Sequence, residues 1–137
     1  MEIRIFEASD EADVIQLWHR CGLVRPWNDP HKDIERKKQK QPEWFFVGTV
    51  NGSITASVMA GYDGHRGWLY YLAVDPDYQG NGYGRLIVRT AQEALKAAGC
   101  PKINLQVRTE NTRGIEFYRR VGFSQDAVMS MGMRLCD

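Results

Sequence analysis

The segment LAVDPDYQGNGYGR, residues 72–85, decides the fold of this chain. Its apolar beginning is typical of a buried strand end, and the glycine-rich turn Gly80-Asn81-Gly82-Tyr83-Gly84 follows it after a short loop. A helix from Arg85 to Ala98 comes directly after that turn. The first N–H groups of a helix lack partners inside it and carry a partial positive charge, and glycine lets a phosphate approach them closely. The segment therefore predicts a strand, a pyrophosphate-binding turn and a helix in succession.

Two other nucleotide-binding motifs are also rich in glycine, and neither fits this segment. A dinucleotide fingerprint follows the first strand of its unit and has an acidic residue about 20 positions later. Here three strands come first, and the strand after the helix carries Asn104 and Gln106 instead. A phosphate loop of the Walker type needs GK[ST], whereas this chain has Gly84-Arg85-Leu86. The remaining alternative is a turn that contains glycine for tightness alone.

Three strands are expected before the glycine-rich segment. Trp44–Val50 and Ile54–Tyr62 flank Asn51-Gly52, the dipeptide most typical of a two-residue hairpin turn. A further turn leads to the apolar run Trp68–Val74. These three strands should be antiparallel to one another.

Nearer the N-terminus the pattern predicts one strand and two helices. Ile3–Ala8 begins with apolar and polar residues in alternation, which is typical of a short strand. A helix that ends at Gly22 follows, and its apolar face contains Val14, Leu17, Trp18 and Cys21. Asp29 before Pro30 is a helix-start signature, so a second, highly charged helix is expected from Pro30 to Gln39.

After the helix that follows the glycines, the chain predicts a strand, a helix and further strands. Ile103, Leu105 and Val107 alternate with polar residues, and a helix should run from Asn111 or Thr112 through Arg120. Phe123 onward can supply one or two more strands. The expected order is β α α β β β α β α β in a single α/β domain over residues 1–137, with a right-handed parallel crossover within a mixed sheet.

Composition excludes several classes of protein. With 137 residues, 43% hydrophobic and 26% charged, the chain resembles an ordinary globular domain, and its net charge of +1 gives no sign of nucleic-acid or membrane-surface binding. The start of the sequence does not resemble a signal peptide, and no stretch approaches the ~20 apolar residues of a membrane span. The cysteines, Cys21, Cys100 and Cys136, have no metal-ligand spacing, so free thiols, no metal and a cytoplasmic location are expected.

A second motif lies downstream, and together the two motifs resemble those of the GNAT acetyltransferase superfamily. The family signature [R/Q]-x-x-G-x-[G/A] corresponds to Gln79, Gly82 and Gly84. The downstream pattern N-x(5)-F-Y-x-x-x-G-F is matched by Asn111, Phe117, Tyr118, Gly122 and Phe123. The resemblance covers nearly the whole chain and is most specific from Leu72 to Phe123.

The resemblance implies a GNAT-like fold in which two parallel strands splay apart and acetyl-CoA, the cosubstrate, enters between them. Backbone groups of Leu72–Val74 would bond to the pantetheine arm, and N–H groups from about Gly80 to Arg85 would bind the pyrophosphate. The residues expected to contact the coenzyme are Leu72, Ala73, Val74, Gln79, Gly80, Asn81, Gly82, Tyr83, Gly84, Arg85, Asn111 and Tyr118.

The resemblance also implies a chemical role for Tyr118, as the acid that protonates the leaving thiolate after an amine attacks the thioester directly. A phenol is protonated at neutral pH and can donate. The alternative is a tyrosine that packs on its ring and bonds the coenzyme without transferring a proton. A backbone N–H near Val74 would stabilise the oxyanion. The general base stays open among Asp63, His65 and Glu116.

The acceptor site is expected where this family varies. The cluster Arg25–Asp29 and the turn Tyr62–Arg66 would border it, with Trp27, Asn28, Asp63 and His65 as candidate substrate contacts. The predicted function is acetyl-CoA-dependent N-acetyl transfer to a primary amine of a small molecule or protein. The alternative is a non-catalytic acyl-CoA-binding or sensing domain. The apolar residues of the last segment fit either core or the edge of a homodimer: Val128, Met129, Met131 and Met133.

Overall fold

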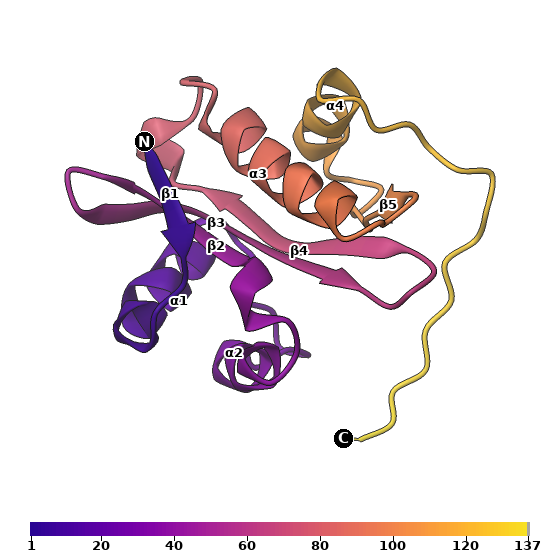
Figure 1. Cartoon of the computed structure of the whole chain (residues 1–137), viewed down its shortest axis with the longest axis horizontal. Helices are drawn as coiled ribbons and strands as arrows, with labels where there is room; N and C mark the ends of the chain where they lie inside the picture. The colour runs from indigo at the N-terminus through magenta and orange to yellow at the C-terminus, as the bar shows by residue number, and fades with distance from the viewer. Residues whose placement is uncertain (137) are drawn as a thin grey trace. The chain divides into compact units, whose positions relative to one another are not determined.

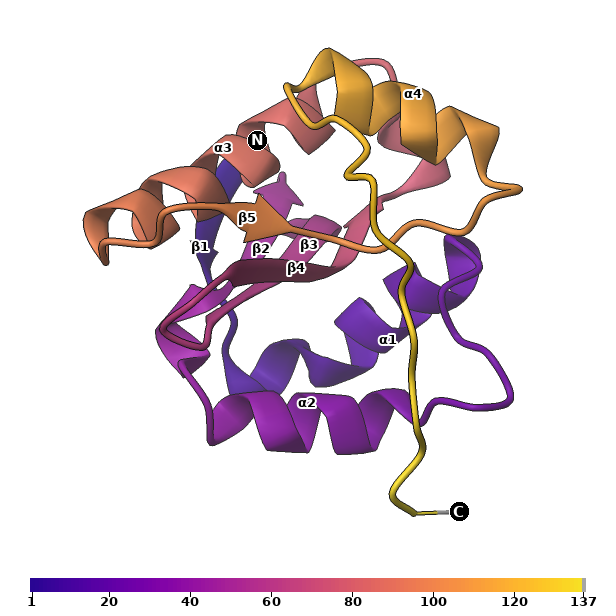
Figure 2. The same ribbon diagram turned by 90° about the vertical axis from the view of Figure 1, so that its right-hand side faces the viewer.

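The computed structural model describes residues 1–136, and its chain divides into two compact units (Figures 1 and 2). The first unit, Met1–Leu105, contains a sheet and three helices, and the second begins at Gln106 and contains one helix. The strands are β1 (Glu2–Ile5), β2 (Phe45–Val50), β3 (Ser53–Tyr62), β4 (Gly67–Val74) and β5 (Ile103–Asn104). The helices are α1 (Glu11–Arg20), α2 (Pro30–Lys38), α3 (Tyr83–Ala97) and α4 (Thr112–Arg120).

The sheet has the order β1-β2-β3-β4-β5, and only the β4–β5 pair is parallel. The predicted hairpin joins β2 to β3, where Asn51 and Gly52 have φ of +51° and +79°. Two positive φ angles in succession give the turn whose twist matches that of the flanking strands. The mixed α/β fold that the sequence predicts is therefore confirmed.

Helices cover both faces of the sheet within the first unit: α1 and α2 lie on one face, and α3 lies on the other (Figure 2). The larger apolar cluster contains fully buried Trp18 from α1, Ile34 from α2, and Phe45 and Val47 from β2. On α3 the buried residues recur at helical spacing, so one face of the helix packs against the sheet: Ile87, Val88, Ala91 and Leu95.

The parallel pairing of β4 with β5 is short. Strand β5 pairs with β4 only at Gly67↔Ile103 and Trp68↔Asn104, whereas β4 continues to Val74. Within the first unit, no other strand pairs with 69–74 on that side. Within the first unit, the edge of β4 over 69–74 therefore has no strand partner on the side of β5.

The structure also corrects two expectations at the C-terminal end. The strand expected over 103–107 is only two residues long, and no strand forms in the described residues after Phe123. A strand needs a neighbouring ladder for its backbone groups, and residues 124–136 have none. The apolar side chains of this segment are therefore 79–92% exposed instead of forming core: Val128, Met129, Met131, Met133 and Leu135.

Two leucines of α3 test the packing of this helix against the sheet. Leu95 is fully buried and Leu86 is 41% exposed. We expect Leu95→Ala to lower the free energy of unfolding by about 2–5 kcal/mol, because it leaves a cavity, whereas Leu86→Ala should change it by less than about 1 kcal/mol. Urea denaturation measures both. Equal losses in the two variants would contradict the packing described for α3.

Candidate functional site

The glycine-rich segment forms an exposed loop that leads directly into α3. A short 3₁₀ turn, Pro76–Tyr78, precedes Gly80 and Gly82, whose φ angles are +86° and +80°. A Cβ at either glycine would have no atom within 4 Å, so the space beside the backbone is open. Gly82 is the N-cap of α3, and no side chain caps this helix. The partial positive charge at the start of α3 is therefore available to an anion.

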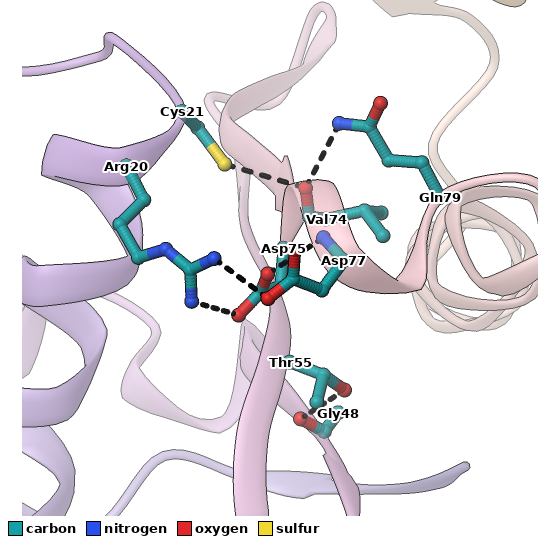
Figure 3. A network of polar contacts seen from close by, with 8 residues as sticks. All are labelled: Arg20, Cys21, Gly48, Thr55, Val74, Asp75, Asp77 and Gln79. Atoms are coloured by element: carbon teal, nitrogen blue, oxygen red, sulfur yellow. Dashed lines mark hydrogen bonds and ion pairs between the residues drawn. The ribbon is translucent and has the colours of Figure 1, made fainter.

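The last turn of α1 fixes the beginning of this loop (Figure 3). The guanidinium of Arg20 donates to Asp75 at 2.7 Å and to Asp77 at 3.1 Å. The other carboxylate oxygen of Asp75 accepts the N–H of Asp77 at 2.9 Å, so both of its oxygens are bonded. Asp75 is only 7% exposed. Loss of either contact would leave a buried carboxylate oxygen without a partner and would lower the stability of the fold.

The N–H and C=O groups of Val74 point away from β3. The N–H of Asp75 donates to the carbonyl of Thr55 at 2.8 Å, and in an antiparallel ladder the residue before it turns its N–H and C=O to the opposite side. On that side the carbonyl of Val74 accepts from the Cys21 thiol at 3.3 Å and from the Gln79 amide at 3.1 Å (Figure 3). Both lone pairs of this carbonyl oxygen are used. The N–H of Val74 is therefore the backbone group of this residue that remains to bond a ligand.

The Cys21 thiol is part of this arrangement. Burial raises the pKa of Cys21, with the Asp75 charge adding to the effect. The side chain is therefore a neutral S–H donor to the Val74 carbonyl at neutral pH.

A β-bulge that the sequence did not predict interrupts β4 just before Leu72. Tyr71 has φ of +53°, and Tyr71 and Leu72 stand opposite Val58 alone, between the pairs Met59↔Tyr70 and Ser57↔Ala73. Bulges are usually marked by glycine or asparagine, and the run Tyr70-Tyr71-Leu72 contains neither. This run therefore carries no local signal for a bulge.

Of the candidate acceptor residues, Asn28 lies against the bulge. Its amide donates to the Tyr71 hydroxyl at 2.6 Å, and its carbonyl oxygen accepts the N–H of Arg25 at 2.7 Å. Trp27 is exposed, with the Arg25 guanidinium 5.9 Å from its ring centroid. Asn28 therefore connects the loop between α1 and α2 to β4.

The other two acceptor candidates lie in the turn between β3 and β4. The Asp63 carboxylate accepts the N–H groups of His65 and Arg66, each at 2.8 Å. These backbone hydrogen bonds, that of Arg66 first, lower the pKa of Asp63. An ionised carboxylate that closes its own turn is a weak base, so the geometry gives Asp63 a structural role. The side chain of His65 is exposed.

The second unit contains the downstream motif. Asn111 is the N-cap of α4, and its side chain accepts the N–H of Gly114 at 3.0 Å. The Tyr118 ring contacts Phe117 and Phe123 edge to face, with centroids 5.4 and 5.8 Å apart. Burial raises the pKa of Tyr118 to about 12. Glu116, on the same helix, is exposed.

Two further features of the described chain bear on its chemistry. Residues 1–136 contain no group of three or more His, Cys, Asp or Glu side chains arranged to bind a metal ion. Over the same range, no helix has the length and apolar character needed to cross a membrane. What the first unit does offer a ligand is an open strand edge, followed by a loop and an uncapped helix N-terminus.

Asp75 and Asp77 form a matched pair that tests how the loop is fixed. We expect Asp75→Ala to lower the free energy of unfolding by about 1–3 kcal/mol, because it removes a turn-capping hydrogen bond and the buried partner of Arg20. Asp77→Ala should have a much smaller effect, since the Asp77 side chain is 76% exposed. Thermal and urea denaturation measure both. A larger effect at Asp77 would contradict this account.

Comparisons with known proteins agree with this geometry. The Acetyltransferase (GNAT) family matches residues 12–123. The chain is 49% identical over 135 residues to a protein named "Acetyltransferase" from Yersinia pestis (strain Pestoides F), covering 98% of this chain and 96% of that one. A protein named "Acetyltransferase SG1711" from Sodalis glossinidius (strain morsitans) is 49% identical over 138 residues, covering 100% of this chain and 97% of that one.

Solved structures share the fold. The ribosomal-protein-S18-alanine N-acetyltransferase from Escherichia coli has a TM-score of 0.75 and 26% identity, over 91% of this chain and 78% of that one. AAC(6')-Iy, in complex with the bisubstrate analog CoA-S-monomethyl-acetylneamine, has a TM-score of 0.79 and 18% identity, over 98% of both chains. From the match over residues 12–123 and the identity to its relatives, the chain belongs to the GNAT family of acetyltransferases.

Proposed function

We propose that this protein is an acetyl-CoA-dependent N-acetyltransferase that moves an acetyl group to a primary amine by direct attack. The observation that carries the proposal is the open edge of β4, which ends at the glycine loop and the uncapped start of α3. An extended amide chain bonds to a strand edge, and a pyrophosphate binds at a helix N-terminus. Coenzyme A has both parts, in that order.

The coenzyme arm would lie along Leu72–Val74, with the N–H of Val74 as a donor, since its carbonyl already has two partners. The same N–H is the candidate oxyanion donor. The pyrophosphate would accept N–H groups from about Gly80 to Arg85. The bisubstrate complex of AAC(6')-Iy, a protein of the same fold, supports a coenzyme site in this chain as well. Asn111 would add a contact from the second unit.

Tyr118 is the proposed general acid. The acceptor nitrogen attacks the thioester carbon and loses a proton to a base or to water. The C–S bond breaks, the phenol gives its proton to the leaving sulfur, and the phenolate regains a proton from solvent. With a pKa of about 12, Tyr118 is protonated throughout the physiological range. Its surroundings therefore keep it in the form that a proton donor needs.

The candidate residues for acceptor binding lie on two segments of the first unit. Asn28 and Trp27 lie on the loop between α1 and α2, and His65 lies in the turn before β4. We propose that the loop that contains Trp27 and Asn28 borders the site for the amine of a small molecule or a protein, and that His65 is a further candidate contact from its separate turn. The three free, separated cysteines fit a reducing compartment, so we propose the cytoplasm as the location.

Tyr118→Phe tests the acid. We expect kcat to fall by about 10²–10⁴-fold while acetyl-CoA affinity changes little, because the ring remains and only the proton-donating hydroxyl is lost. Because the pKa of Tyr118 is raised, ionisation of this group should cause no fall in the wild-type kcat as the pH rises to about 11. Thiol release from acetyl-CoA with a panel of amines, amino acids and peptides measures both.

Three outcomes of the panel are informative. Release that requires an acceptor and collapses in Tyr118→Phe supports the enzyme and identifies its substrate class. Unchanged kcat in Tyr118→Phe contradicts the acid role. Tight coenzyme binding with no release on any acceptor would instead favour a sensing domain.

A further inference from the structure

The bulge at Tyr71 lies immediately before the backbone that is proposed to bind the coenzyme. A bulky side chain rarely adopts φ of +53°, so the surrounding structure must maintain this conformation. Because Leu72–Val74 follow directly, rotation at Tyr71 would re-aim every peptide group in that segment. The conformation of one residue therefore sets the direction of the N–H groups on the open edge.

The carbonyl and the ring of Tyr71 are fixed by buried groups. The Ser57 hydroxyl donates to the Tyr71 carbonyl at 2.8 Å and accepts the indole N–H of Trp18, also at 2.8 Å. The Trp18 ring stacks on the Tyr71 ring, with centroids 3.8 Å apart and planes 17° apart. Trp18 and Ser57 are fully buried. These contacts connect the bulge to both α1 and β3.

The hydroxyl of Tyr71 is fixed by two further residues. It donates to the Asp33 carboxylate at 2.5 Å and accepts from the Asn28 amide at 2.6 Å. Burial, and after it the hydrogen bond to Asp33, raise the pKa of Tyr71, so the phenol remains a donor. A hydrogen bond to a charged acceptor is stronger than one between neutral groups. The Tyr71 network is therefore Trp18, Asn28, Asp33, Ser57 and Tyr71.

We propose that Tyr71 is a positioning residue for acetyl-CoA: its hydroxyl, carbonyl and ring are fixed by Asn28, Asp33, Ser57 and Trp18, and this maintains the bulge that aims the N–H group of Val74 at the coenzyme arm. The inference rests on the proposed function, because it assumes that the coenzyme binds along this edge. It assigns to Tyr71 a role that acts through the backbone of Leu72–Val74. Through Asn28, the network also makes coenzyme binding depend on the loop proposed for the acceptor.

Tyr71→Phe and Tyr70→Phe are a matched test of this inference. Both remove one hydroxyl from adjacent tyrosines, but Tyr70 is 50% exposed and outside the Tyr71 network. In NMR spectra of the free, isotope-labelled protein, the amide chemical shifts of residues 72–74 should change in Tyr71→Phe and remain unchanged in Tyr70→Phe. The acetyl-CoA dissociation constant should rise about tenfold in Tyr71→Phe, as expected for a lost charge-assisted hydrogen bond, and by less than about twofold in the control.

A second pair of variants separates positioning from general stability. Tyr71→Gly and Tyr71→Ala both remove the ring and the hydroxyl, but only glycine adopts a positive φ without strain. If the network maintains the bulge, Tyr71→Gly should bind acetyl-CoA more tightly than Tyr71→Ala at temperatures where both are folded. Equal affinities in this pair would overturn the inference.

Other outcomes distinguish this inference from the proposed function. Loss of stability in Tyr71→Phe, with unchanged amide signals and unchanged coenzyme affinity, would overturn the positioning role and leave the proposed function intact. A wild-type protein that binds no acetyl-CoA would overturn both the proposed function and the assignment of Tyr71 to the coenzyme. The amide signals would then still decide whether the network maintains the bulge.

Discussion

The end of the β4–β5 pairing after two residue pairs is the constraint on which the rest of the first unit depends. Backbone N–H and C=O groups need partners, and a strand that loses its neighbour must find them elsewhere. At Val74 the protein satisfies the carbonyl with Cys21 and Gln79 and leaves the N–H facing outward. The open edge is thus selective: its acceptor is occupied, and its donor is the group left for a ligand.

The first helix contributes to this edge at two points along its length. Trp18 stacks on the bulge, and Arg20 binds the carboxylate of Asp75 at the start of the glycine loop. The cationic side chain also lies in the last turn of α1, where it interacts favourably with the helix dipole. One amphipathic helix therefore fixes both ends of the segment Tyr71–Asp75, which explains how an open strand edge remains ordered.

Sequence alone predicted those features that local chemistry determines. Asn51-Gly52 requires two positive φ angles, and Asp29 caps α2 by accepting two N–H groups. Gly80 and Gly82 of the loop adopt the left-handed conformation that other residues avoid. The bulge at Tyr71 escaped prediction because its cause lies in Trp18, Asp33 and Ser57, which are 14 to 53 positions away. The expected C-terminal strand failed for a related reason, since alternation shows that a segment suits a strand but does not supply its neighbour.

The bulge in β4 has a second consequence, which concerns self-association. A flat strand with unpaired backbone groups is a template on which another chain can add a strand. Natural sheets reduce this hazard by keeping such edges short and by twisting them out of register. On the side away from β3, the edge of β4 lacks a partner strand only over 69–74, and the kink at Tyr71 divides this stretch. The conformation that shapes this edge for a small extended ligand thus makes it a poor surface for the growth of intermolecular sheets.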